Sequence, residues 1–89
     1  MSWMKSVSLQ ATGTGTIGGT GSSTLLGFVN VNTGASSAVL TLRKSSSTGA
    51  VIATIDASAA GVKAFFATYK DGVYYALTGG NADITITFE

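Results

Sequence analysis

The residues that could perform acid–base chemistry are few and scattered along the chain. There is no His and no Cys among the 89 residues, and the carboxylates are Asp56, Asp71, Asp83 and Glu89. Without His, a Ser or Thr nucleophile would need a Lys or a carboxylate as its base, and no such group lies in a recognisable motif. Asp71 is explained by a predicted turn, and Asp56 is explained by a turn or by a helix cap. Asp83 and Glu89 alternate onto the polar face of a predicted strand. We therefore predict no catalytic residues and expect that the protein is not an enzyme.

Metal and cofactor sites are not indicated by the sequence. Zinc would lack its usual nitrogen and sulfur ligands. The residues with side-chain oxygens that a calcium site might use lack the spacing of a known loop; they are Asn30, Asn32, Asp56 and Asn81. The Gly13-x-Gly15-x-x-Gly18 pattern matches the dinucleotide fingerprint in form, but that motif must open a helix, and Gly19-Thr20-Gly21 follows it. We expect no metal and no cofactor.

Charge is sparse, with five basic and four acidic residues and a net charge of +1, while 45% of the residues are apolar. This balance provides neither a basic footprint for nucleic acid nor a polybasic patch for a membrane. The N-terminal residues contain no apolar run of signal-peptide length, so we expect synthesis in the cytosol. A small core without disulfides, on a nearly neutral chain, favours self-association. We expect a homo-oligomer, with a trimer favoured.

Hydrophobic periodicity predicts an all-β protein. Runs with alternating or β-branched character cover residues 3–9, 24–31, 38–44, 51–55, 63–69, 73–77 and 83–89. Their spacing predicts a small antiparallel β-sandwich or jelly-roll-like domain of about seven strands. Residues 56–61 could form either a loop or one helical turn capped by Asp56. We expect one domain, in which residues 1–23 form an N-terminal strand plus an arm and residues 24–89 form the sandwich.

The Asp71-Gly72 pair between two aromatic runs predicts a β-hairpin over residues 65–77. A two-residue type I′ turn would set Tyr69 opposite Tyr74. Both faces of such a hairpin would be partly apolar, so both would need cover. One cover would be the rest of the chain, and the other a second copy or a partner protein.

Residues 11–23 contain five Gly, four Thr, two Ser and the single large apolar residue Ile17. This composition cannot form a helix and can bury little surface, so it predicts a long loop or an extended arm. On one hypothesis the arm becomes ordered along a neighbouring surface through main-chain hydrogen bonds. The alternative is a plain surface loop that stays mobile.

Residues 24–89 resemble a family of small structural proteins of tailed phages. The resemblance is carried by the order of LGFVNVN (26–32), AVLTL (38–42), STGAVIATID (47–56), YKDGVYY (69–75) and GGNADITI (79–86). It implies a non-enzymatic virion component, foremost a capsid decoration (cement) protein that stabilises the shell as an oligomer. The implied partner is the major capsid protein or another virion protein, and the implied location is the virion, assembled in the host cytoplasm. The family contributes no active-site residues.

The candidate interface residues are Trp3, Ile17, Tyr69 and Tyr74. Large aromatic and apolar side chains are common at protein interfaces, and Trp3 lies close to the predicted arm. An alternative function uses the same aromatic residues differently. In that case Trp3, Tyr69 and Tyr74 stack on a sugar in a carbohydrate-binding module, or the protein is a tail- or fibre-associated recognition module.

Overall fold

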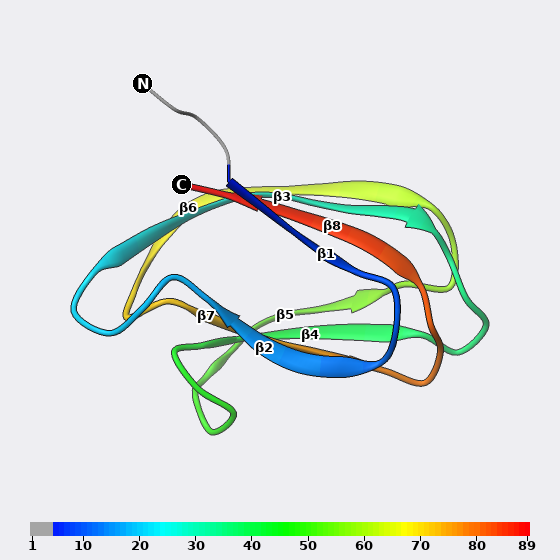
Figure 1. The fold of residues 1–89 in the computed structure, drawn as a ribbon, viewed down its shortest axis with the longest axis horizontal. Helices are drawn as coiled ribbons and strands as arrows, with labels where there is room; N and C mark the ends of the chain where they lie inside the picture. The colour runs from blue at the N-terminus through cyan, green and yellow to red at the C-terminus, as the bar shows by residue number, and fades with distance from the viewer. Residues whose placement is uncertain (1–4) are drawn as a thin grey trace.

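The computed structural model describes residues 5–89, which form two antiparallel sheets stacked as two layers (Figure 1). Sheet A has the strand order β1-β8-β3-β6, and sheet B has the order β2-β7-β4-β5. The strands are β1 (Lys5–Leu9), β2 (Gly13–Ile17), β3 (Ser23–Thr33), β4 (Val39–Lys44), β5 (Val51–Asp56), β6 (Gly61–Lys70), β7 (Val73–Thr78) and β8 (Asp83–Phe88). The predicted all-β sandwich is confirmed.

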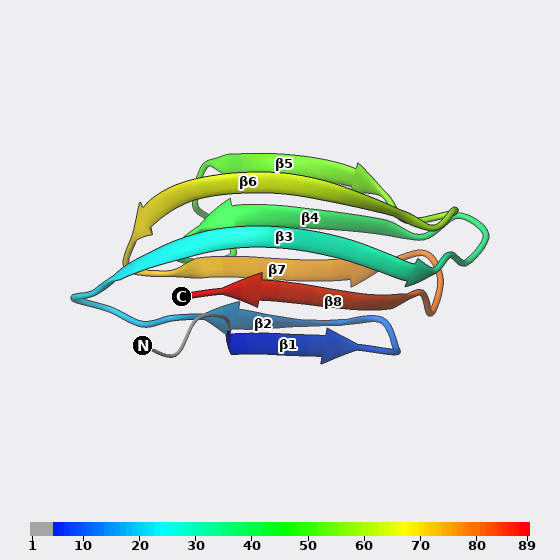
Figure 2. The same ribbon diagram turned by 90° about the horizontal axis from the view of Figure 1, so that it is seen from above.

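The strand pairing is that of a jelly roll. Strand β1 pairs with β8, β2 with β7, β3 with β6 and β4 with β5, as if one long hairpin had been rolled into two layers. Figure 2 shows the consequence from above: β1 lies over β2 at one side of the sandwich, and β6 lies over β5 at the other.

Period-two alternation decides which side chains fill the space between the sheets. On β8, Ile84 and Ile86 are fully buried, while Thr85 and Thr87 lie on the opposite face. The same alternation buries Leu40 and Leu42 of β4. The core also includes Leu9 and Ile17 from the N-terminal segment, so the predicted division between residues 23 and 24 is not a boundary in the packing.

The predicted hairpin over residues 65–77 is wrong, because β6 and β7 belong to different sheets. Tyr69 pairs with Thr24 of β3, whereas Tyr74 pairs with Thr16 of β2 on one side and Arg43 of β4 on the other. Each aromatic run has its own apolar face toward the core. Placing the two runs in opposite layers buries both faces, which a flat two-stranded hairpin would not achieve.

The local geometry of Asp71-Gly72 is nevertheless the one expected, with φ of 66° and 91°. The polar groups of this turn bond to other segments. Asp71 N–H donates to Ser22 O over 2.8 Å, and Gly72 O accepts from Ser45 N–H over 3.1 Å. Because β6 and β7 lie in different sheets, this turn carries the chain from one layer to the other.

The predicted N-terminal arm is also wrong, because residues 13–17 form strand β2 along β7. Ile17 is only 2% exposed and pairs with Val73 in the core. Gly15 lies opposite Tyr75, whose ring end occupies the space that a Cβ on Gly15 would need. Gly15 thus makes room for the tyrosine ring, and Ile17 fixes the strand to the core.

One smaller expectation is settled by the structure, and another lies partly outside the described residues. Residues 57–60 form a loop rather than a helical turn, and Asp56 Oδ1 accepts a hydrogen bond from Ser58 N–H over 2.9 Å. The first strand begins at Lys5 among the described residues, so its predicted first residues, including Trp3, lie outside them. Within residues 5–89 there is no helix of the length and apolarity needed to span a membrane.

Candidate functional site

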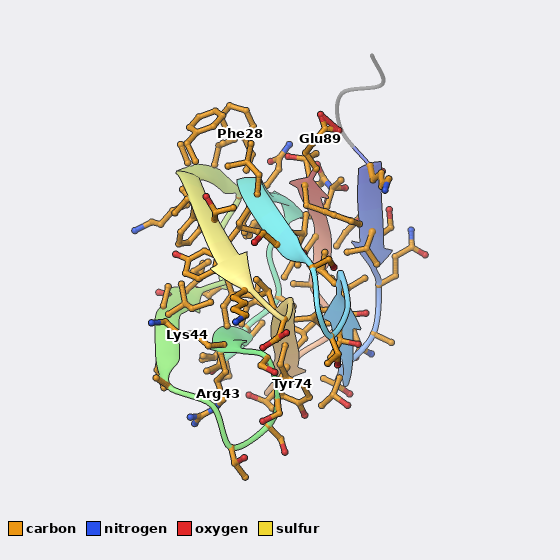
Figure 3. All side chains as sticks on the ribbon, turned by 90° about the vertical axis from the view of Figure 1, so that its left-hand side faces the viewer. Phe28, Arg43, Lys44, Tyr74 and Glu89 are labelled. Carbon is orange, nitrogen blue, oxygen red and sulfur yellow. The ribbon has the colours of Figure 1, made fainter. Side chains whose placement is uncertain are left out.

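The predicted interface residues do not form one surface. The Ile17 side chain is buried in the core, so it is not available to a partner on the surface of the folded chain. Tyr69 is half-buried and packs against the core from sheet A. Tyr74 lies half-buried on the outer face of sheet B beside Arg43, as Figure 3 shows. Trp3 lies outside the described residues. Tyr69 and Tyr74 therefore do not build a common aromatic platform for a sugar.

A different aromatic pair lies on the outer face of sheet A. The rings of Phe28 and Phe66 meet edge to face, with centroids 4.8 Å apart and an interplanar angle of 81°. Phe66 is 54% exposed, and Val62, on the same strand, is 64% exposed. We name Phe28, Val62, Ala64 and Phe66 the β3–β6 patch. Figure 3 shows Phe28 projecting from the surface opposite the one that carries Tyr74.

A bulge in β6 directs Phe66 outward. Leu26 pairs with Ala67 and Phe28 with Ala64, so two residues of β6, Phe65 and Phe66, lie opposite Gly27 alone. Phe66 has a φ of 48°, in the left-handed region. That region costs a bulky L-residue roughly 1–2 kcal/mol and is uncommon outside turns. Strained backbone of this kind concentrates where a side chain is held for a function.

A second irregularity positions Phe28. Leu26 pairs with Phe88 and Val29 with Ile86, which leaves Gly27 and Phe28 opposite Thr87 of β8. The Thr87 hydroxyl accepts a hydrogen bond from Phe28 N–H at 3.0 Å and donates one to Phe28 O at 3.4 Å. These bonds satisfy the backbone groups that the irregular pairing frees, so the Phe28 ring is held in a defined place.

The patch is uncharged and has a polar border. Asn30 lies beside Val62 across the β3–β6 pairing, and Asn32 Nδ2 donates to Thr85 Oγ1 over 2.9 Å on the same face. An apolar centre with a polar rim is the usual anatomy of a surface that buries itself against a macromolecule. On contact with a partner, the β3–β6 patch would bury two aromatic rings and an aliphatic side chain away from water.

A hollow of about 240 Å³ opens between β5 and β6, with Val31, Ile55 and Lys63 among its lining residues. This is smaller than the roughly 300–1,000 Å³ of most small-molecule sites. Asp56 also lines it. Hydrogen bonds from Ser58, first from its side chain and then from its backbone N–H, lower the pKa of Asp56 from its ordinary value of 3.8. Among residues 5–89, no three His, Cys, Asp or Glu side chains gather as a metal site would require.

The β3–β6 patch was missed from the sequence, although two signals pointed to it. Gly27 inside an apolar strand is typical of a bulge, and the Phe65-Phe66 doublet interrupts the alternation of β6. Together they indicate a place where one aromatic ring turns outward. A scan against protein-family models and a search of curated proteins found no match for this chain.

Proposed function

We propose that the protein is a non-enzymatic structural protein of a phage virion, a capsid decoration protein that binds the shell through the β3–β6 patch and acts as an oligomer. One observation carries the proposal: Phe66 is held outward against Phe28 by a strained backbone, although the ring is more than half exposed. A folded chain gains little stability from such a ring. A binding surface gains a rigid aromatic anchor, because aromatic side chains dominate the energetics of protein interfaces.

Two further features support this role. The resemblance of residues 24–89 to tailed-phage structural proteins implies it directly. The net charge of +1 and the apolar content of 45% are suited to a chain that functions within an assembly. Jelly rolls occur in viral capsid domains, but also in lectin domains, so the fold alone does not decide between them.

The proposal is tested on particles from the organism that encodes the chain. Tailed particles are purified on a density gradient, and their proteins are quantified by mass spectrometry. We expect this chain in the particle fraction, at a copy number comparable to that of the shell protein. The chain would instead remain at the top of the gradient if the proposal were wrong.

The carbohydrate-binding alternative has one observation in its favour, the occurrence of jelly rolls in lectin domains. Tyr69 and Tyr74, two of the residues predicted to stack on a sugar, lie in different layers, which weakens this alternative. A glycan array separates the two functions: specific glycan binding by a chain that is absent from particles would favour the lectin-like function.

A further inference from the structure

The sandwich has four edge strands, which are β1 and β6 in sheet A and β2 and β5 in sheet B. An edge strand presents unpaired N–H and C=O groups to any strand that approaches it. Natural sheets block their edges with charges, bulges or proline. The four edges of this protein differ in how well they are blocked.

Three of the edges carry such devices. Strand β6 has Lys63, Lys70 and the bulge at Phe66. The β4–β5 pairing shifts register beside Arg43, and β5 ends at Asp56. Strand β1 begins at Lys5.

Strand β2 carries none of them. Its sequence is GTGTI, and it pairs with β7 without a register shift from Gly13 opposite Leu77 to Ile17 opposite Val73. Along its other side lies no strand of the described residues. Thr14 and Thr16 are exposed on the outer face of the sheet, and neither makes a side-chain hydrogen bond within residues 5–89. The edge is therefore uncharged, regular and open.

We propose that β2 pairs antiparallel with β2 of a second copy of this chain, about a two-fold axis at Gly15. In that register Thr14 lies opposite Thr16 of the partner subunit, and Gly13 lies opposite Ile17 of the partner subunit. A two-fold contact brings each surface against its own copy, so like charges near the axis would oppose one another. Strand β2 has no charge to oppose, and threonine pairs across strands are favourable.

The surroundings of β2 fit a second copy. Strand β1 lies over β2 at the same side of the sandwich (Figure 2), so the axis that pairs the β2 edges also brings the β1 edges toward each other. A shallow hollow of about 260 Å³ opens at this side, with Leu9, Gln10 and Tyr75 among its lining residues. Pairing would make the two copies of sheet B one continuous sheet and would cover this hollow. The inference rests on the oligomeric part of the proposed function and not on the attachment to a shell.

A charge exchange across the axis tests both the contact and its register. Sedimentation equilibrium is measured for the wild-type chain and for two double variants. In Thr14→Lys/Thr16→Lys, like charges face each other across the axis, and we expect the dimer to bind about ten-fold more weakly. In Thr14→Lys/Thr16→Glu, each new ammonium group faces a new carboxylate of the partner subunit, and we expect the dimer to be restored.

The matched control is Thr54→Lys/Thr68→Lys, which adds the same two charges at exposed threonines of β5 and β6. It should dimerise like the wild type. Circular dichroism checks that all variants fold, and amide exchange in residues 13–17 should slow as the concentration of wild-type chain rises. A wild-type monomer at millimolar concentration, a trimer, or equal dissociation of the two β2 variants would overturn the proposal. Shell attachment is tested separately at Phe66, so the two proposals fail in different experiments.

Discussion

The rings of Phe28 and Phe66 meet edge to face on the outside of sheet A, 4.8 Å apart, because β3 and β6 are irregular at the same level. Neither ring contributes to the core cluster. An edge-to-face aromatic contact is worth about 0.5–1.5 kcal/mol, which only offsets the roughly 1–2 kcal/mol cost of the left-handed conformation of Phe66. The pair is therefore near neutral for folding, and its geometry is best explained by binding.

Phe66→Asn tests that balance. Asn tolerates positive φ, so the substitution relieves the backbone at the same time as it removes the ring contact. We expect the melting temperature to stay within about 5 °C of the wild-type value, corresponding to about 1 kcal/mol or less. The control is Phe65→Asn, which removes the neighbouring ring that packs against the core and should lower the melting temperature clearly. A large loss in Phe66→Asn would show that the outward ring is structural.

Gly72→Ala should destabilise the crossing between the layers. Gly72 has a φ of 91°, and a Cβ there would press against the carbonyl oxygen of Ile17. We expect a loss of about 2 kcal/mol, or about 10 °C in melting temperature. Gly61→Ala is the control, because a Cβ at Gly61 meets nothing within 4 Å. Equal melting temperatures for the two variants would contradict the structure of the turn.

Asp71→Ala should weaken the same crossing for a different reason. Asp71 Oδ1 accepts a hydrogen bond from Gly21 N–H over 2.7 Å, and the residue has a φ of 66°. Ala loses the acceptor and tolerates this φ poorly, so we expect a loss of about 1–2 kcal/mol in chemical denaturation. Asn keeps an acceptor oxygen and tolerates positive φ, and Asp71→Asn should recover most of the loss. If both variants lost the same stability, the carboxylate charge rather than the geometry would be responsible.

Asp56 gives the protein a defined response to acid. Its pKa in the folded chain is lowered below 3.8 by the Ser58 hydrogen bonds, so the folded state favours the ionised form. The ionised Asp56 carboxylate therefore stabilises the folded state at pH values above its unfolded-state pKa. This contribution to the free energy of unfolding is lost as the pH falls through the lower, folded-state pKa. An NMR titration of the Asp56 carboxyl carbon should give a pKa below 3.8, which Ser58→Ala should raise. A value at or above 3.8 in the wild type would refute this account.

The sequence was most informative where burial follows a simple period. Strand β8 was predicted almost to the residue, because Ile84 and Ile86 alternate with polar residues and only one face is buried. Strand β2 was missed because Gly13 and Gly15 lower its strand propensity and leave few side chains to bury, although Thr and Ile favour strands. What makes it a strand is its pairing with β7 and the fit of Tyr75 over Gly15, and both of these contacts are distant in sequence.

The Asp71-Gly72 turn shows the same division between local and distant causes. The dipeptide predicted positive φ at both residues, which the structure has. It did not predict which strands pair, because that depends on how two apolar faces are shared between two layers. The candidate site was not predicted for a related reason. The ring contact between Phe28 and Phe66 arises from two irregularities, one in the β3–β6 pairing and one in the β3–β8 pairing, and both depend on the register of these three strands.

The most direct test of the central claim is co-sedimentation of the chain with purified shells of the particle that contains it. Wild type is compared with Phe66→Asn and with Val51→Asn, a control on sheet B whose side chain is 50% exposed, close to the 54% of Phe66. We expect Phe66→Asn to bind about 30-fold more weakly, as for an aromatic anchor worth about 2 kcal/mol, and Val51→Asn to bind like the wild type. Wild-type binding by Phe66→Asn would contradict attachment through the β3–β6 patch.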